Sequence, residues 1–245
     1  MRRSGVGCTF LNMFENEGQV APAADASAGP KRERTRALIR AVALRSLREK
    51  GYDATTMRGI AEEAGLSVGN AYYHFPTKDH LVQELYVEVQ QEHRTIAAPQ
   101  LDGEDDFVTR VGIVVRTGLG NLRSWHEVAP QFLTTAIAPG SPNNPMSPES
   151  APARDVVLGL FEDAVAGART RLPGTLAADV PKALWMAYLL LALFWVYDTS
   201  PGQRRTDRLV DALLGVLRFA LPMLRVRPFR RAVTDIVAVA AGRDA

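Results

Sequence analysis

The sequence predicts an all-α protein of about nine or ten helices. Apolar residues recur at intervals of three and four from residue 31 to near the C-terminus, a spacing that places them on one face of a helix. The alternation of apolar and polar residues that is typical of strands is almost absent. Glycine and proline separate the apolar runs, as they do between helices.

Composition is typical of a soluble globular protein. Of the 245 residues, 47% are hydrophobic and 23% are charged, which leaves ample apolar surface for a core. Cys8 is the only cysteine, so the chain forms no intramolecular disulfide and no cysteine-based zinc site. Arg2 and Arg3 are not followed by the apolar run of an export signal. We therefore expect a cytoplasmic protein without a metal or a cofactor.

Charge is distributed unevenly along a chain whose net charge is +2. Residues 31–80 carry ten basic and six acidic side chains, whereas residues 81–200 carry eight and fourteen. A basic block beside an acidic middle is expected when one part of a chain meets a polyanion. Solvated faces produce the same imbalance, so charge alone does not identify a nucleic-acid-binding protein.

The boundaries of the first helices follow from capping residues. Residues 1–30 are poor in large apolar groups and predict a flexible arm. A helix begins at Lys31 and stops at Gly51, its expected C-cap. Thr77 caps a long helix that reaches His93.

Further helices are predicted near residues 107–115, 127–136, 157–168 and 228–240 from their apolar stripes. The stretch Ala138–Pro152 contains five prolines and predicts an exposed loop.

Residues 56–74, within the segment Ala54–Lys78, predict a helix-turn-helix. Thr56 can cap a first helix, and Gly65 permits a tight turn after it. Ser67 then caps a short second helix over residues 68–73. Two helices joined by a short turn that contains glycine form the supersecondary unit with which many proteins read DNA.

The side chains of the second helix suit a DNA groove. Gly69 lets the backbone approach, Asn70 can form a bidentate pair with an adenine edge, and Val68 can pack on a thymine methyl group. Donors suited to phosphates follow at Tyr72, Tyr73, His74 and Lys78.

The segment Thr35–Val89, and above all GYDATTMRGIAEEAGLSVGNAYYHFPTKDHL, resembles the DNA-binding domain of the tetracycline-repressor (TetR) family. The resemblance implies a three-helix DNA-binding domain at residues 31–92, a helical ligand-binding and dimerisation domain at residues 93–245, and a homodimer. By position it assigns to DNA binding the residues Thr56, Arg58, Ser67, Val68, Gly69, Asn70, Tyr72, Tyr73, His74 and Lys78.

Two features depart from the family pattern. Ser46 stands where the family usually has a large apolar residue on its first helix, which predicts a tighter or less stable head. The N-terminal arm is longer than most, and two interpretations stay open: a minor-groove contact by Arg2 and Arg3, or a misplaced translation start.

An uncharged run from Ala183 to Tyr197 is shorter than the roughly 20 residues of a membrane span. A helix that is apolar all round otherwise lies in a core or a subunit interface. The stripe in residues 207–221 is its expected partner. The residues expected at the dimer interface are Leu190, Val210, Leu213, Leu214 and Leu217.

The core aromatic residues are candidates for a ligand pocket, because such sites are mostly apolar with a few polar groups. The candidates are Trp125, His126, Trp185, Phe194 and Trp195. Aromatic residues at helical spacing are also common in plain cores, so both interpretations stay open.

The leading hypothesis is a transcriptional repressor that a small apolar ligand releases from a palindromic operator. Its expected partners are double-stranded DNA, a second copy of the chain and that ligand, with no membrane. The alternative is a constitutive DNA-binding or architectural protein without an effector. The sequence contains none of the hydrolase, phosphate-loop or metalloprotease motifs, and we expect no enzyme.

Overall fold

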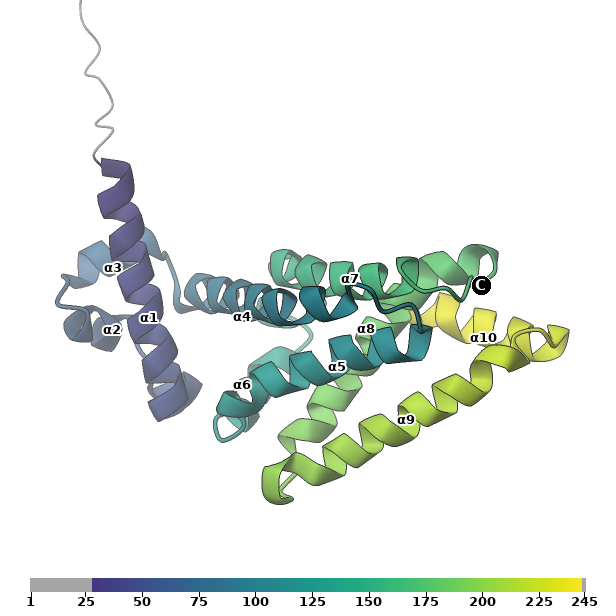
Figure 1. The fold of residues 1–245 in the computed structure, drawn as a ribbon. Coiled ribbons are helices and arrows are strands. Elements are labelled where there is room, and N and C mark those ends of the chain that lie inside the picture. Colours follow the sequence, from purple (N-terminus) through teal and green to yellow (C-terminus); the bar gives the residue numbers. More distant parts are fainter. Residues whose placement is uncertain (1–27, 244–245) are drawn as a thin grey trace, which may run out of the picture.

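The structure is a computed structural model that describes residues 28–243. The predicted fold class is confirmed, since the described residues form α-helices, two short 3₁₀ turns (Arg123–Trp125 and Pro201–Gln203) and no strand. The helices are α1 (Ala28–Ala54), α2 (Met57–Glu63), α3 (Val68–His74), α4 (Lys78–Leu101), α5 (Phe107–Leu122), α6 (Ala129–Ile137), α7 (Ala151–Ala166), α8 (Gly174–Val196), α9 (Arg204–Met223) and α10 (Arg227–Ala240). Figure 1 shows α1, α2 and α3 as a head at one end of α4, with the remaining helices around its other end.

The head has its own hydrophobic core. Its buried apolar residues come from α1, α2, α3 and the first turns of α4: Ile39, Val42, Ala43, Leu47, Met57, Ile60, Ala61, Ala71, Phe75, Leu81, Val82 and Leu85. The regular part of α1 ends at Gly51, as predicted, where φ is 78°, a value that favours glycine. Residues 28–30, expected in the arm, already belong to α1, because a proline such as Pro30 is tolerated in a first helical turn. Arg2 and Arg3 lie outside the described residues.

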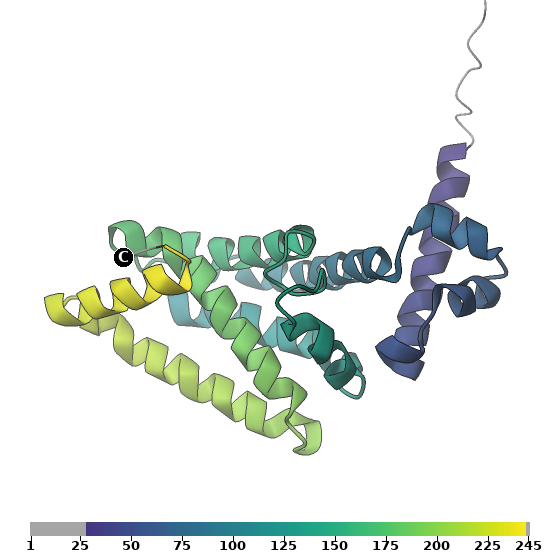
Figure 2. The ribbon, with the colours of Figure 1, turned by 180° about the vertical axis from the view of Figure 1, so that it is seen from behind.

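A second hydrophobic cluster fills the space between α4, α5, α7 and α8. Helix α4 packs along α7 and α5, and α8 packs against α7 and α10. Viewed from behind in Figure 2, α6 lies at the edge of this core that faces the lower end of α1. The core therefore touches the head through α4 and through α6.

A buried arginine fixes the far end of α4 against α7. The Arg110 guanidinium donates hydrogen bonds to the carbonyl oxygens of Leu101 (2.7 Å) and Glu104 (2.5 Å), at the end of α4, and to those of Asp163 (2.7 Å) and Ala164 (2.9 Å) in α7. The last carbonyls of a helix have no partner within the helix and carry partial negative charge. Arg110 thus stabilises two helix C-termini at once.

Helix α8 is longer than the predicted uncharged run, which began at Ala183. The helix already begins at Gly174 and includes Pro181 and Lys182. By length and composition, Leu176–Val196 could cross a membrane, but the core helices of soluble proteins can be equally long and apolar. Here α8 contributes Trp185 and Trp195 to the second cluster and contacts α5, α7, α9 and α10.

The loop between α6 and α7 is less exposed than predicted. Asn143 and Ser150 are buried, with 1% and 3% of their surfaces exposed. The cause is a set of hydrogen bonds to α4: the Gln83 side-chain amide donates to the Pro142 carbonyl oxygen (2.7 Å) and to Asn143 Oδ1 (3.0 Å), and Ser150 Oγ donates to Gln83 Oε1 (3.3 Å).

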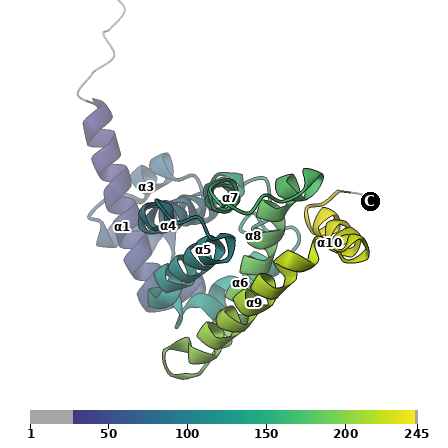
Figure 3. The same ribbon diagram turned by 45° about the vertical axis from the view of Figure 1, so that its right-hand side comes forward.

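Helix α9 lies along the outside of α5 and α8 (Figure 3). Its Val210 is buried within its own chain, and Leu214 and Leu217 pack on the second cluster. The expectation that Val210 faces a second subunit is therefore wrong, since its own core already covers it. Exposed apolar side chains instead occur at Leu190 and Phe194 on α8, at its C-cap Tyr197, and at Leu213, Val216, Phe219 and Met223 on α9.

Candidate functional site

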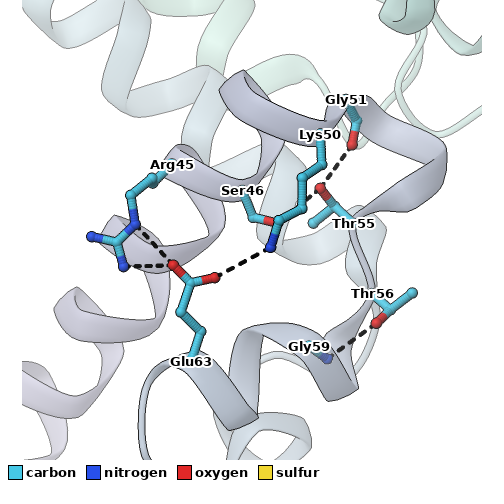
Figure 4. Close-up of polar contacts among 8 residues, drawn as sticks. All are labelled: Arg45, Ser46, Lys50, Gly51, Thr55, Thr56, Gly59 and Glu63. Carbon is cyan, nitrogen blue, oxygen red and sulfur yellow. Dashed lines mark hydrogen bonds and ion pairs between the residues drawn. The ribbon is translucent and has the colours of Figure 1, made fainter.

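The predicted helix-turn-helix is present, with the predicted caps. Thr56 Oγ1 accepts a hydrogen bond from the Gly59 amide (3.1 Å), and Ser67 Oγ accepts one from the Asn70 amide (3.2 Å). Gly65 adopts a φ of 67° in the turn between α2 and α3, where a side chain would be strained. These local interactions, the first of which is drawn in Figure 4, set where both short helices begin and end.

Polar contacts hold α2 against α1 (Figure 4). The Glu63 carboxylate accepts hydrogen bonds from the Arg45 guanidinium (2.6 and 2.8 Å) and lies 3.6 Å from Lys50 Nζ. The hydrogen bonds from Arg45 and the two cations lower the pKa of Glu63, although desolvation acts in the opposite direction. Glu63 therefore stays ionised at neutral pH and fixes the orientation of α2 on α1.

The polar residue at position 46 has a partner in the head. Ser46 is buried, and its Oγ lies 3.2 Å from Thr55 Oγ1, which in turn donates to the Gly51 carbonyl oxygen (2.7 Å). A buried hydroxyl that is hydrogen bonded avoids the penalty of an unpaired polar group. Ser46 and Thr55 thus link the end of α1 to the start of α2, as Figure 4 shows.

The exposed face of α3 carries the predicted DNA-binding residues. Tyr72 and Tyr73 are 48% and 67% exposed, large values for aromatic side chains, and Val68 and Asn70 are half-buried. A side chain added at Gly69 would meet nothing within 4 Å, so the packing of the chain itself does not require glycine there. This face is therefore open to an external partner. Arg58 on α2 and the Thr56 and Ser67 caps are also exposed.

Two predicted phosphate contacts face inward. His74 is buried, and burial together with the charges of Arg32 and Arg36 lowers its pKa, so its imidazole is neutral and covered. Its burial contradicts the expectation of a phosphate contact. Lys78 Nζ donates to the carbonyl oxygens of Tyr52 (2.9 Å) and Thr55 (3.2 Å), and this amine caps the end of α1.

The core contains a cavity of about 540 Å³. All three tryptophans of the chain, Trp125, Trp185 and Trp195, line it, as do Tyr86 and Gln90 from α4, Phe132 from α6 and Tyr188 from α8. The volume lies within the roughly 300–1,000 Å³ of small-molecule sites, and the wall is mostly apolar, as is usual for them.

Two of the five predicted pocket residues do not line the cavity. His126 Nε2 lies 3.0 Å from the Trp195 carbonyl oxygen, and the two rings meet edge to face with centroids 4.8 Å apart, so His126 supports Trp195 from behind. Phe194 is exposed on the outer face of α8, because it precedes Trp195 by one position and so points away from the core.

Sequence reasoning missed several lining residues. Gln90 lies among polar residues of α4, and no sequence pattern distinguishes it from solvent-facing glutamines. The Asn144–Met146 part of the loop lines the cavity as well. The five prolines in this loop indicate exposure, but they do not show that the segment folds back over α4.

The cavity and the head share residues. Leu47, Val82 and Leu85 belong to the head core and also line the cavity. On α6, the Phe132 ring meets the Tyr52 ring of α1 edge to face at 5.8 Å, so a change in the cavity wall reaches α1 directly.

A polar network makes a second connection. Asp79 Oδ1 accepts hydrogen bonds from Tyr52 Oη on α1 (2.8 Å) and from Asn143 Nδ2 in the loop (2.8 Å). Burial and the interaction with Asp79 raise the pKa of Tyr52 to about 12, so its hydroxyl remains a donor at neutral pH.

These features define a helix-turn-helix DNA-binding protein with a separate helical core. The family model described as "Bacterial regulatory proteins, tetR family" matches residues 39–85, and the model described as "Tetracyclin repressor-like, C-terminal domain" matches residues 110–236, more than half of the chain. The chain therefore belongs to the TetR family of transcriptional regulators. Members of the family bind DNA and form dimers, and they are generally not enzymes.

Sequence similarity to individual curated proteins covers little more than a quarter of the chain. The chain is 41% identical over 64 residues to the HTH-type transcriptional repressor KstR2 of Rhodococcus jostii (strain RHA1), a match that covers 26% of this chain and 30% of that protein. An uncharacterised HTH-type transcriptional regulator of Mycobacterium bovis is 35% identical over 72 residues, 29% of this chain and 34% of that protein. The matched stretch thus spans about a third of the relatives' length.

Two solved structures show the same fold. A TetR regulator from Nitrosomonas europaea superposes with a TM-score of 0.56 at 19% identity, over 76% of this chain and 99% of that one. The fatty acid degradation regulator FadR from Bacillus halodurans superposes with a TM-score of 0.56 at 17% identity, over 75% of this chain and 96% of that one. At such identities the likeness concerns the fold alone.

Proposed function

We propose that this chain is a repressor that binds a palindromic operator through α3 and leaves it when a small, mainly apolar ligand occupies the core cavity. The exposed face of α3 supports DNA binding. The match to a protein named as a transcriptional repressor supports repression rather than activation. As a DNA-binding regulator it would act in the cytoplasm.

The roles of the α3 residues follow from their exposure. Asn70 pairs with an adenine edge and Val68 packs on a thymine methyl group, with Gly69 allowing close approach. Tyr72 and Tyr73 donate to phosphates from the exposed end of the helix. Lys78 acts indirectly, since its amine holds the end of α1 in place.

A palindrome needs two copies of α3, about 34–36 Å apart. Exposed Leu190, Leu213, Val216 and Phe219 on α8 and α9 are the apolar surface that we assign to the dimer interface. Because the two heads are held at the ends of their cores, any change in the angle between head and core changes this spacing.

The ligand would act on that angle through the shared wall. Filling the cavity pushes on Phe132 of α6 and on the loop that carries Asn143, and both contact Tyr52 of α1 directly or through Asp79. A ligand shifts an equilibrium only by the difference in its affinity for the two states. Such differences are typically about 5–150-fold, and operator DNA must weaken ligand binding by the same factor.

A footprint of the purified full chain on DNA that flanks its own gene tests the DNA-binding half. We expect two protected half-sites related by a two-fold axis, which Asn70→Ala weakens and the exposed α4 variant Gln91→Ala leaves intact. Protection without symmetry, or equal effects of the two variants, would contradict the assignment of α3.

A constitutive DNA-binding protein without an effector is the second candidate. It predicts operator affinity that no cavity ligand changes. The size of the cavity and its contact with the head core favour the ligand-responsive protein.

A further inference from the structure

The chemistry of the cavity wall restricts its ligand. Among the described residues that line it there is no carboxylate, no lysine and no histidine, and Arg154 is the only charged side chain of that set. Arg154 Nη1 already donates to two carbonyl oxygens of the loop, those of Pro145 (2.8 Å) and Ser147 (3.0 Å). Its charge thus helps to hold the loop in place.

Two residues that line the cavity each carry a polar atom without a hydrogen-bond partner within the described part of the chain. These atoms are the indole Nε1 of Trp195 and the side-chain Oε1 of Gln90, both buried at the atom level. Trp195 is 3% exposed, so its N–H is removed from bulk water. A buried donor or acceptor that stays unpaired is costly, and most native groups of this kind are paired.

The two tyrosines that α4 and α8 contribute to the wall are neutral as well. Burial raises the pKa of Tyr86 and of Tyr188, so both remain phenols at neutral pH. Apart from Arg154, whose Nη1 is engaged by the loop carbonyls, the wall has no charge that could neutralise a charged ligand, and burying an unpaired charge is far more costly than burying a neutral oxygen.

We propose that the cavity takes an uncharged, mainly apolar molecule with two oxygen functions: an acceptor such as a ketone, which receives a hydrogen bond from Trp195 Nε1, and a hydroxyl, which donates to Gln90 Oε1. This inference names the ligand class of the site in the proposed function and rests on that function. Trp195 and Gln90 are then the residues that determine specificity, and the tyrosines and aliphatic side chains supply the apolar enclosure.

Binding can be measured without DNA, because every tryptophan of the chain lines the cavity. We would titrate the full-length protein with three ten-carbon probes, 2-decanone, 1-decanol and 1-chlorodecane, and follow tryptophan emission. The ketone tests the Trp195 donor, the alcohol tests Gln90, and the chloroalkane has the apolar body without a strong hydrogen-bonding group.

Trp195→Phe should weaken 2-decanone binding about 3- to 10-fold, the value of one hydrogen bond, and change 1-chlorodecane binding less than about 2-fold. Gln90→Met, which keeps the side-chain length, should weaken 1-decanol binding by a similar factor and change 1-chlorodecane binding less than about 2-fold. Trp125 and Trp185 still report binding in the first variant.

The proposal would be overturned if Trp195→Phe lost equal affinity for the ketone and the chloroalkane. It would also be overturned if no probe changed the tryptophan emission of the wild-type protein. Tighter binding of decanoate than of 1-decanol, lost in Arg154→Gln, would overturn it in favour of an anionic ligand. If the probes bind as expected but never lower operator affinity, the ligand site stands and the proposed control of DNA binding fails.

Discussion

Asn143→Ala tests the connection between the loop over the cavity and the DNA-binding head. The substitution removes the hydrogen bond from Asn143 Nδ2 to the Asp79 carboxylate (2.8 Å) and the one that Asn143 Oδ1 accepts from Gln83 (3.0 Å), at a site that is 1% exposed. A bond to a charged group contributes about 1.5–3 kcal/mol and a neutral one about 0.5–1.5 kcal/mol. Gln83 keeps its hydrogen bond to the Pro142 carbonyl oxygen, so we expect the free energy of unfolding to fall by about 2–4 kcal/mol in total.

Thermal unfolding by circular dichroism at fixed protein concentration measures this loss. For a chain of this size, about 2–4 °C per kcal/mol gives a fall in Tm of about 4–16 °C. The neighbouring Asn144→Ala is the matched control, since Asn144 bonds only within the loop, to Ala138 and Met146. Equal shifts for the two variants, or a shift below about 2 °C for Asn143→Ala, would refute the view that Asn143 anchors the loop to the head.

Three further predictions concern assembly, acid stability and DNA affinity. Leu213→Glu should convert dimer to monomer or aggregate in sedimentation, because it places a charge in an apolar interface, whereas Ile96→Glu, at a site of similar exposure on α4 (41% against 45%), should stay dimeric. Burial alone would raise the pKa of Asp198, but hydrogen bonds from Ser200 and Thr206 outweigh burial and lower that pKa. The ionised carboxylate therefore stabilises the fold above pH 4, and this stabilisation is lost on further acidification. Urea melts of Asp198→Asn should show a shallower loss of stability below pH 4 than those of the wild type. Tyr73→Ala should weaken DNA binding on all sequences alike, as measured by anisotropy, and an effect confined to one sequence would contradict a phosphate contact.

The helix-turn-helix could be predicted because its signals are local. Thr56, Gly65 and Ser67 act within three or four residues of their own positions, through caps and one turn, and the structure contains all three. The inward faces of the long helices were predictable for a similar reason, since the period of the apolar residues fixes which side is buried.

The cavity could be predicted only in part, because its wall is assembled from distant segments. Aromatic side chains indicated Trp125, Trp185 and Trp195, but the same argument selected Phe194, which the turn of the helix directs outward. The unpaired state of Gln90 depends on neighbours from other helices and leaves no trace in the sequence.

Burial of polar groups in the head was also beyond sequence reasoning. His74 follows two exposed tyrosines, yet the helix turns it toward α1. Lys78 begins α4 where a phosphate could lie, but the carbonyl oxygens at the end of α1 are closer partners. In both cases a tertiary contact decides the role of a side chain whose type suits DNA.

Ligand-controlled release from DNA is tested by operator affinity with and without a cavity ligand. We would titrate a labelled operator from the footprint with the wild-type protein at several fixed concentrations of the tightest-binding probe, and measure probe affinity with and without saturating operator. We expect the probe to weaken operator binding and the operator to weaken probe binding by the same factor. Equal probe affinity for the free and the DNA-bound protein would contradict ligand-controlled release and favour a constitutive DNA-binding protein.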